Sequence, residues 1–228
     1  MSTNERTRFR PSRSLATVSD EGGVRVVAVM FADLSGFTAV AEKLTPPALA
    51  TWLGRYLDAI AEPVLRHGGT IEQVMGDGVL AIFAPAMGPA SAAATDHPRA
   101  AASCALEVAM AVAVLNRRLL SEGWPIVGVR IGLHVGPVVT ARLSAGRLGL
   151  GTLAGDAINT AARLQQQARG AGRDTDTETR IVVSDGFRAA MGEGWAVQRL
   201  GTMTLRGKRQ RITAWQLLAE VEPVALAA

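Results

Sequence analysis

VRVVAVMFADLSGFT, residues 24–38, places a strand directly before a polar turn that contains glycine. Val24–Phe31 is a nearly continuous run of β-branched and apolar residues, which is typical of a strand buried on both faces of a sheet. Asp33 begins the turn, and a helical pattern follows it. Backbone N–H groups at such a turn can bind phosphate oxygens, so the stretch predicts a buried strand followed by an anion-binding turn.

The segments that follow this strand alternate between helical and extended patterns. Helices are predicted after Thr38, from Pro46 to about Arg66, from about Pro98 to Ser121, from Asp156 to about Arg169 and over Asp185–Met191. Strands are predicted at Thr70–Met75, Val79–Ala84, Val127–Val135, Val138–Leu143, Ile181–Ser184 and as a closing pair within Trp195–Leu218. This order predicts an α+β fold with helices packed against one sheet, in a single domain over residues 24–218 between a flexible arm (1–23) and a tail (219–228).

Two aspartates are candidates for a metal site. Asp33 ends the first strand, and Asp77 lies in a Gly-Asp-Gly turn between two short apolar runs. If those strands are neighbours, both carboxylates meet at one edge of the sheet and offer the hard oxygen ligands that suit Mg²⁺ or Mn²⁺. Either aspartate taken alone could equally be a turn residue, because Asp-Gly is a common hairpin sequence.

A second candidate pair lies on a predicted helix. Asn159 and Arg163 are four residues apart and therefore share one helix face. An amide beside a guanidinium can bind a sugar oxygen and a phosphoryl group that gains charge during a reaction. The alternative is an ordinary pair of polar residues that faces solvent.

Composition excludes several classes of protein. Hydrophobic residues make up 48% of the 228, enough for a real core, and the net charge is only +4. The basic residues are scattered and aromatic residues are few (4%), unlike a nucleic-acid-binding stripe. Cys104 is the one cysteine, which excludes an internal disulfide and suits a reducing compartment. No membrane span or signal peptide is expected, so we predict a cytoplasmic protein.

Five stretches occur in order along the chain: Phe31–Thr38, Met75–Phe83, Gly132–Val138, Gly155–Leu164 and Leu205–Lys208. Together they resemble the successive signatures of the class III adenylate/guanylate cyclase catalytic domain. The resemblance covers roughly residues 24–218. It implies a ferredoxin-like βαββαβ core with additional strands and helices, and a homodimer that converts a nucleoside triphosphate, most often ATP, into a 3′,5′-cyclic nucleotide.

The resemblance also assigns roles to individual residues. It implies that Asp33 and Asp77, with Leu34 beside them, hold two Mg²⁺ or Mn²⁺ ions per site. Asn159 would orient the ribose and Arg163 would stabilise the α-phosphoryl charge, each acting in the site of the opposite subunit. The substrate would further contact Ser35, Gly36, Phe37, Thr38 and Gly76, the base-reading positions Gln73 and Thr152, and Arg206 or Lys208 at the terminal phosphates.

The base-reading positions depart from the family pattern. Adenylate cyclases usually carry a lysine where this chain has Gln73, and guanylate cyclases typically carry a glutamate there. Thr152 resembles a subgroup with threonine or serine at that position, many of them adenylate cyclases. A glutamine can both donate and accept hydrogen bonds, so adenine, guanine and the pyrimidines all stay open.

Two other functions remain open from the sequence. The chain could be a cyclase of different base specificity, making cyclic GMP, or cyclic CMP or UMP in phage defence. It could also be an inactive cyclase-like domain that binds nucleotide or dimerises. The presence of Asp33, Asp77, Asn159 and Arg163 together favours an active enzyme.

Overall fold

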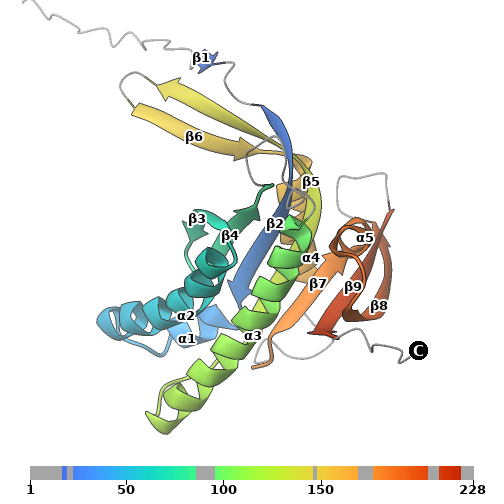
Figure 1. The fold of residues 1–228 in the computed structure, drawn as a ribbon. Helices are drawn as coiled ribbons and strands as arrows, with labels where there is room; N and C mark the ends of the chain where they lie inside the picture. The colour runs from blue at the N-terminus through green and yellow to red at the C-terminus, as the bar shows by residue number, and fades with distance from the viewer. Residues whose placement is uncertain are drawn as a thin grey trace, which may run out of the picture.

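The structure is a computed structural model that describes residues 17–19, 23–85, 96–145, 148–168, 177–204 and 211–221 (Figure 1). Its elements are β1 (Thr17–Ser19), β2 (Val24–Leu34), α1 (Phe37–Ala41), α2 (Pro46–Arg66), β3 (Thr70–Met75), β4 (Gly78–Phe83), α3 (His97–Ser121), β5 (Val129–Ala145), β6 (Leu148–Ala154), α4 (Asp156–Gln167), β7 (Arg180–Ser184), α5 (Asp185–Met191), β8 (Trp195–Thr204) and β9 (Arg211–Glu220).

All described strands belong to one sheet. Its main path runs β3-β4-β2-β5-β7-β9-β8, and β1 and β6 each pair with β5. The segment from β2 to β5 has the order βαββαβ, and its strands lie side by side as β3-β4-β2-β5, all antiparallel. This is the ferredoxin-like core, so the predicted α+β fold class is confirmed.

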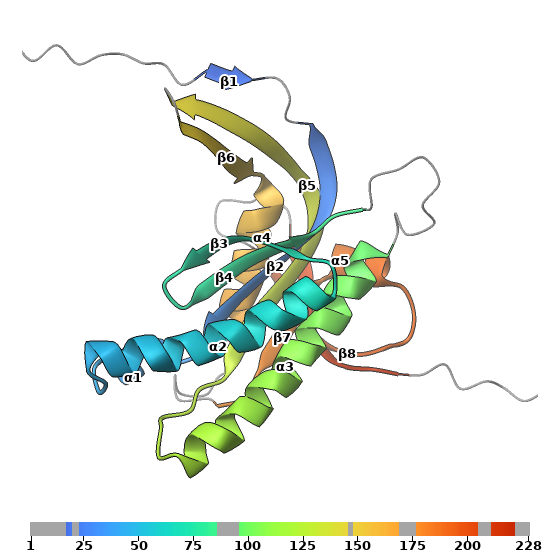
Figure 2. The same ribbon diagram turned by 60° about the vertical axis from the view of Figure 1, so that its left-hand side comes forward.

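Helices cover both faces of the sheet, as the apolar run of β2 predicts. Alternate β2 residues belong to two different clusters, because successive side chains of a strand point to opposite faces. Ala28 and Met30 pack in the cluster that α2 and α3 share, whereas Val27 and Val29 pack against Ala157 of α4 and its neighbours. Figure 2 shows α2 and α3 on one side of the sheet and α4 on the other.

The long strand β5 and its partner β6 differ from the sequence prediction. Two strands separated by Gly136-Pro137 were expected, but β5 runs unbroken through both residues. Pro137 pairs with Val26 of β2 and lies between the part of β5 that pairs with β7 and the part that pairs with β6. The described strands therefore leave one side of β5 without a partner there, and the missing N–H of proline breaks no ladder bond.

Three further strands also differ from the sequence prediction. Strand β6 was not predicted, because its glycines weaken the strand signal of its leucines. The short strand β1 falls within the arm predicted over residues 1–23 and pairs with β5 from Thr17↔Ser144 to Ser19↔Arg142. Strand β9 continues to Glu220, two residues into the predicted tail.

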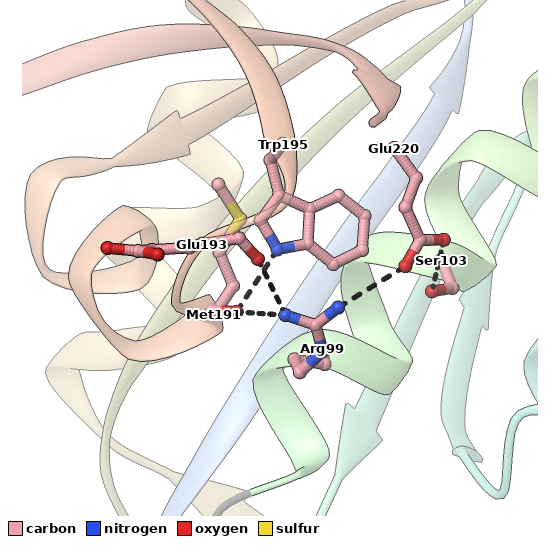
Figure 3. A network of polar contacts seen from close by, with 6 residues as sticks. All are labelled: Arg99, Ser103, Met191, Glu193, Trp195 and Glu220. Atoms are coloured by element: carbon pink, nitrogen blue, oxygen red, sulfur yellow. Dashed lines mark hydrogen bonds and ion pairs between the residues drawn. The ribbon is translucent and has the colours of Figure 1, made fainter. Parts of the chain in front are cut away.

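The arginine side chain at the start of α3 ties the C-terminal hairpin to the rest of the fold (Figure 3). Arg99 Nη1 donates to the carbonyl oxygens of Met191 (3.1 Å) and Glu193 (2.8 Å). Its Nη2 pairs with Glu220 Oε1 at 3.3 Å, and the guanidinium lies 5.0 Å from the ring centroid of Trp195. One side chain therefore connects α3 with the end of α5, with β8 and with β9.

A buried network holds the loop that leads into β5. The hydroxyl of Tyr56 donates to Asn116 Oδ1 and accepts the N–H of Val127 at 3.1 Å. The amide of Asn116 donates to the carbonyl of the same valine at 2.9 Å. Burial raises the pKa of Tyr56 to about 12, although the bond from Val127 partly opposes this shift. The start of β5 is thereby anchored to α2 and α3.

Helix α3 is long and apolar enough to cross a membrane, by length and composition, and is the one such helix in the described part of the chain. Alanines give the helix its high mean hydropathy despite their small size, and the helix does not contradict the expectation that the chain has no membrane span. One such helix is weak evidence for a membrane span, since helices in the core of a globular protein pass the same test. Ala101, Ala105 and Val108 are fully buried against the sheet, as in a core helix.

Candidate active site

The two predicted metal-binding aspartates lie next to each other. Asp33, the second-to-last residue of strand β2, pairs in register with Gly78 at the start of β4. Asp77 immediately precedes that glycine, in the two-residue turn that joins β3 to β4. Gly76, the other turn residue, has a φ of 62°, a conformation that glycine adopts without strain. The adjacency of β2 and β4 therefore brings both carboxylates to one edge of the sheet.

Burial and the nearby Asp33 carboxylate change the acidity of Asp77. Its pKa is raised from 3.8 to about 6, first because burial disfavours the charged form and second because the negative charge of Asp33 is close. Backbone N–H groups of Asp77 and Leu34 oppose this shift by bonding to the carboxylate. A pair of acidic groups whose charges repel is the arrangement that a divalent cation relieves.

Two donors that sequence reasoning missed bind Asp33 on one oxygen. Arg130 Nη2 lies 2.6 Å from Asp33 Oδ2, and Gln165 Nε2 lies 2.9 Å from the same atom. Arg130 stands directly opposite Asp33 on β5, and its Nη2 also approaches the carbonyl oxygen of Leu34 at 3.3 Å. Both side chains are almost fully buried.

The sequence held a signal for each of these donors. Arg130 interrupts the apolar run Val127–Val135, where a charged residue is costly to bury without a partner. Gln165 follows Ala157 and Ala161 at spacings of four, which places it on the buried face of α4. Neither signal names the partner, because Asp33 is distant in sequence.

A cavity of about 400 Å³ opens beside the aspartates. It is lined by Asp33, Leu34, Gly36, Phe37, Thr38, Ala39, Glu42, Asp77 and Arg130. The predicted contacts Gly36, Phe37 and Thr38 therefore belong to this cavity, where Gly36 adopts a φ of 72° just before α1. Ser35 does not line it: the residue is buried, and its N–H donates to the carbonyl of Gly128 at 2.9 Å.

The donor set fits a divalent cation. Two carboxylates and the Leu34 carbonyl are hard oxygen ligands. Among the residues that the structure describes, no three acidic, histidine or cysteine side chains gather into a larger cluster. Two carboxylates with an open cavity suit Mg²⁺ or Mn²⁺ bound jointly by protein and substrate phosphates, rather than by a closed protein cage.

Asn159 and Arg163 lie away from this cavity. Both are on α4, where Asn159 is exposed and Arg163 is partly exposed, and neither is among the residues that line the cavity. Gln165, which does reach Asp33, is six residues beyond Asn159, or about 9 Å along the helix axis. Arg163 is only two residues before Gln165, but residues two apart point to nearly opposite sides of a helix. One copy of the chain therefore does not bring the two predicted sets of residues together.

The remaining predicted residues are only partly described. Gln73 is exposed on the outer strand β3 opposite Leu80, and it lies on the same sheet face as Asp33. Thr152 pairs with Ala141 through the β6 backbone, but its side chain lies outside the described residues. Arg206 and Lys208 also lie outside them.

Solved structures of cyclases share this architecture. The adenylyl cyclase CyaB from P. aeruginosa matches with a TM-score of 0.77 and 23% identity, over 89% of this chain and 98% of that one. The guanylyl cyclase Cya2 matches with a TM-score of 0.76 and 26% identity, over 90% of this chain and 98% of that one.

Curated relatives point to the same family. The chain is 30% identical to adenylate cyclase 1 of Rhizobium meliloti, over 87% of this chain and 28% of that protein. It is also 30% identical to an adenylate cyclase of Mycobacterium tuberculosis, over 83% of this chain and 39% of that protein. The chain thus spans well under half the length of these two relatives. Residues 21–219 match the model of the adenylate and guanylate cyclase catalytic domain, and the chain belongs to that family.

Proposed function

We propose that this chain is an active nucleotidyl cyclase domain, which converts ATP to a 3′,5′-cyclic nucleotide and pyrophosphate. The observation that carries this proposal is the Asp33–Asp77 pair at the mouth of a cavity lined by the start of α1. Curated relatives named adenylate cyclases support ATP as the substrate.

Each group in the cavity would have a distinct task. Asp33, Asp77 and the Leu34 carbonyl would hold two Mg²⁺ or Mn²⁺ ions, which when bound activate the ribose 3′-hydroxyl and neutralise the triphosphate. Phe37 and Thr38 lie in the first turn of α1, where backbone N–H groups lack partners within the helix and can bind phosphate oxygens.

A second copy of the chain would complete the site. Asn159 would orient the ribose, and Arg163 would stabilise charge that develops on the α-phosphoryl group. Their exposure on α4, away from the cavity of their own copy, supports contribution to a partner. Large apolar side chains also remain exposed at the start of β2 and on β3, among them Val24 (70%), Val26 (54%) and Val74 (51%), as expected for a surface that pairs.

Base selection would depend on Gln73 and Thr152. Gln73 lies on the same sheet face as Asp33, at a strand edge that a nucleotide base could approach. Its amide can pair with adenine but does not by itself exclude guanine or a pyrimidine. We further propose a cytoplasmic enzyme in a signalling role, in keeping with the buried Cys104 and the resemblance to signalling cyclases.

Product analysis tests the proposal. Purified protein would be incubated with Mn²⁺ and equal amounts of ATP, GTP, CTP and UTP, and the products identified by mass spectrometry. We expect cyclic AMP as the main product. Another cyclic nucleotide would correct the base assignment, and no cyclic product from any of the four would refute the proposed activity.

Mixing two inactive variants tests the shared site. Asp77→Ala and Arg163→Ala should each abolish turnover, and a mixture of the two should regain activity through one intact composite site per heterodimer. A mixture that forms heterodimers but stays inactive would show that the two sets of residues do not act together.

A further inference from the structure

The two oxygens of the Asp33 carboxylate have different surroundings. Oδ2 accepts hydrogen bonds from Arg130 at 2.6 Å and from Gln165 at 2.9 Å. Both donors thus meet the same oxygen, from two different elements, β5 and α4. Two bonds to Oδ2 restrict the rotation of the carboxylate, which also lies within hydrogen-bonding reach of the Asp77 carboxyl.

The amide of Gln165 is buried between α4 and β5. The side chain is 4% exposed, although both of its neighbours on the C-terminal side, Gln166 and Gln167, are exposed. Helix α4 lies so close to β5 that a Cβ atom added to Gly132 would come within 2.4 Å of the Gln165 backbone nitrogen. The backbone of α4 therefore packs closely on β5 at Gln165, and the buried amide of this residue bonds to Asp33.

A buried glutamine is costly unless it is bonded, so its contact with Asp33 could serve stability alone. The chemistry of the acceptor argues for more. Asp33 is one of the two carboxylates that fit a divalent cation, and groups that hydrogen-bond to a metal-binding carboxylate set its orientation and its affinity for the ion. Arg130 brings positive charge, which opposes a cation, whereas the neutral amide of Gln165 orients the carboxylate without that repulsion.

We propose that Gln165 is a positioning residue for the cation site, which orients Asp33 so that Oδ1 faces the metal. The inference rests on the proposed function, because it takes Asp33 as a metal ligand. It adds a residue of α4 to the same copy's metal site, although α4 also carries the residues proposed to act in the partner's site.

Mn²⁺ binding to the full chain without nucleotide gives the first test, by isothermal titration calorimetry. Gln165→Met keeps the side-chain volume and removes the donor, and Gln166→Met makes the same change one residue later at an exposed position. We expect Gln165→Met to raise the Kd for Mn²⁺ about tenfold or more, while Gln166→Met leaves it unchanged. Circular dichroism should show both variants folded. An unchanged Kd in folded Gln165→Met overturns the proposal.

Mixed dimers give a second test, which distinguishes a specific role of Gln165 at the metal site from a general disturbance of α4. In the Asp77→Ala/Arg163→Ala mixture, the intact site takes its aspartates from the Arg163→Ala chain and its Asn159 and Arg163 from the other. Gln165→Met on the Arg163→Ala chain should lower activity at limiting Mn²⁺, with recovery at high Mn²⁺. The same change on the Asp77→Ala chain should have little effect. Equal loss on both chains overturns the proposal.

The two tests separate this inference from the proposed function. A wild-type chain that binds Mn²⁺ but forms no cyclic nucleotide would refute the activity, and the Mn²⁺ titration would still decide the role of Gln165. A wild-type chain that binds no Mn²⁺ would overturn the positioning role directly.

Discussion

Asp77→Asn should stabilise the metal-free protein at neutral pH, although it removes a proposed metal ligand. The pKa of Asp77 is raised from 3.8 to about 6 because the carboxyl is partly buried and lies beside Asp33. The charged form is therefore disfavoured in the folded state. An asparagine keeps an oxygen to accept the Leu34 N–H and gains an amide that can donate to Asp33, so repulsion is replaced by a hydrogen bond.

The size of the effect follows from the pKa difference. The difference between 3.8 and about 6 corresponds to at most about 3 kcal/mol. Asp77 is only half-buried, so solvent screening reduces the expected gain to about 1 kcal/mol. For a domain of this size, that gain raises the Tm by about 2–4 °C.

The pH dependence gives the sign of the effect. A carboxyl with a raised pKa in the folded state favours folding below the unfolded pKa of 3.8, and this contribution is lost as the pH rises to about 6. The advantage of Asp77→Asn should therefore be full at pH 7 and absent near pH 3.5.

Thermal unfolding in EDTA, followed by circular dichroism at both pH values, measures this difference. Asp58→Asn, at an exposed position of α2, serves as the matched control and should change the Tm little. Added Mn²⁺ should reverse the order at pH 7, since only the wild type keeps both carboxylates for the ion. A lower Tm for Asp77→Asn in EDTA at pH 7, or an advantage that persists unchanged at pH 3.5, would refute the reasoning.

Three further predictions concern the fold that supports the site. Gly132→Ala should destabilise the protein by about 1–3 kcal/mol in a urea titration, because the new Cβ would lie 2.1 Å from the Ala161 carbonyl oxygen. The control Gly54→Ala, with open space around it in α2, should be neutral or slightly stabilising. Tyr56 is the one tyrosine of the chain, so absorbance at 295 nm reports its ionisation alone. The midpoint should lie near pH 12 in the native protein and near pH 10 after denaturation, and a native midpoint near 10 would contradict its buried placement. Arg99→Ala should lower the free energy of unfolding by about 1–2 kcal/mol in chemical denaturation. Arg99→Lys should recover little of this loss, because an ammonium does not reproduce the planar guanidinium that donates to two carbonyls. Full recovery by lysine would mean that charge alone matters.

Local patterns predicted most of the elements and failed where pairing decides the outcome. The apolar run of β2 and the turn after it were recognisable because strand periodicity and turn residues act over a few positions. The course of β5 through Pro137 was missed, because a proline interrupts a strand only where its N–H is needed. That need depends on which strands lie beside it, and local sequence does not record this.

The candidate site likewise has features that local sequence determines and features that depend on the fold. The sequence by itself determined which residues are candidates for the chemistry: two aspartates at strand ends, an Asn and an Arg on one helix face, and a glycine turn, because these are properties of residue type and short spacing. Only the tertiary structure decided that Asp33 and Asp77 are adjacent and that Arg130 and Gln165, 97 and 132 residues from Asp33, bind one of its oxygens. Those contacts depend on strand register and on how closely α4 packs against β5, and both arise from interactions between segments far apart in the chain.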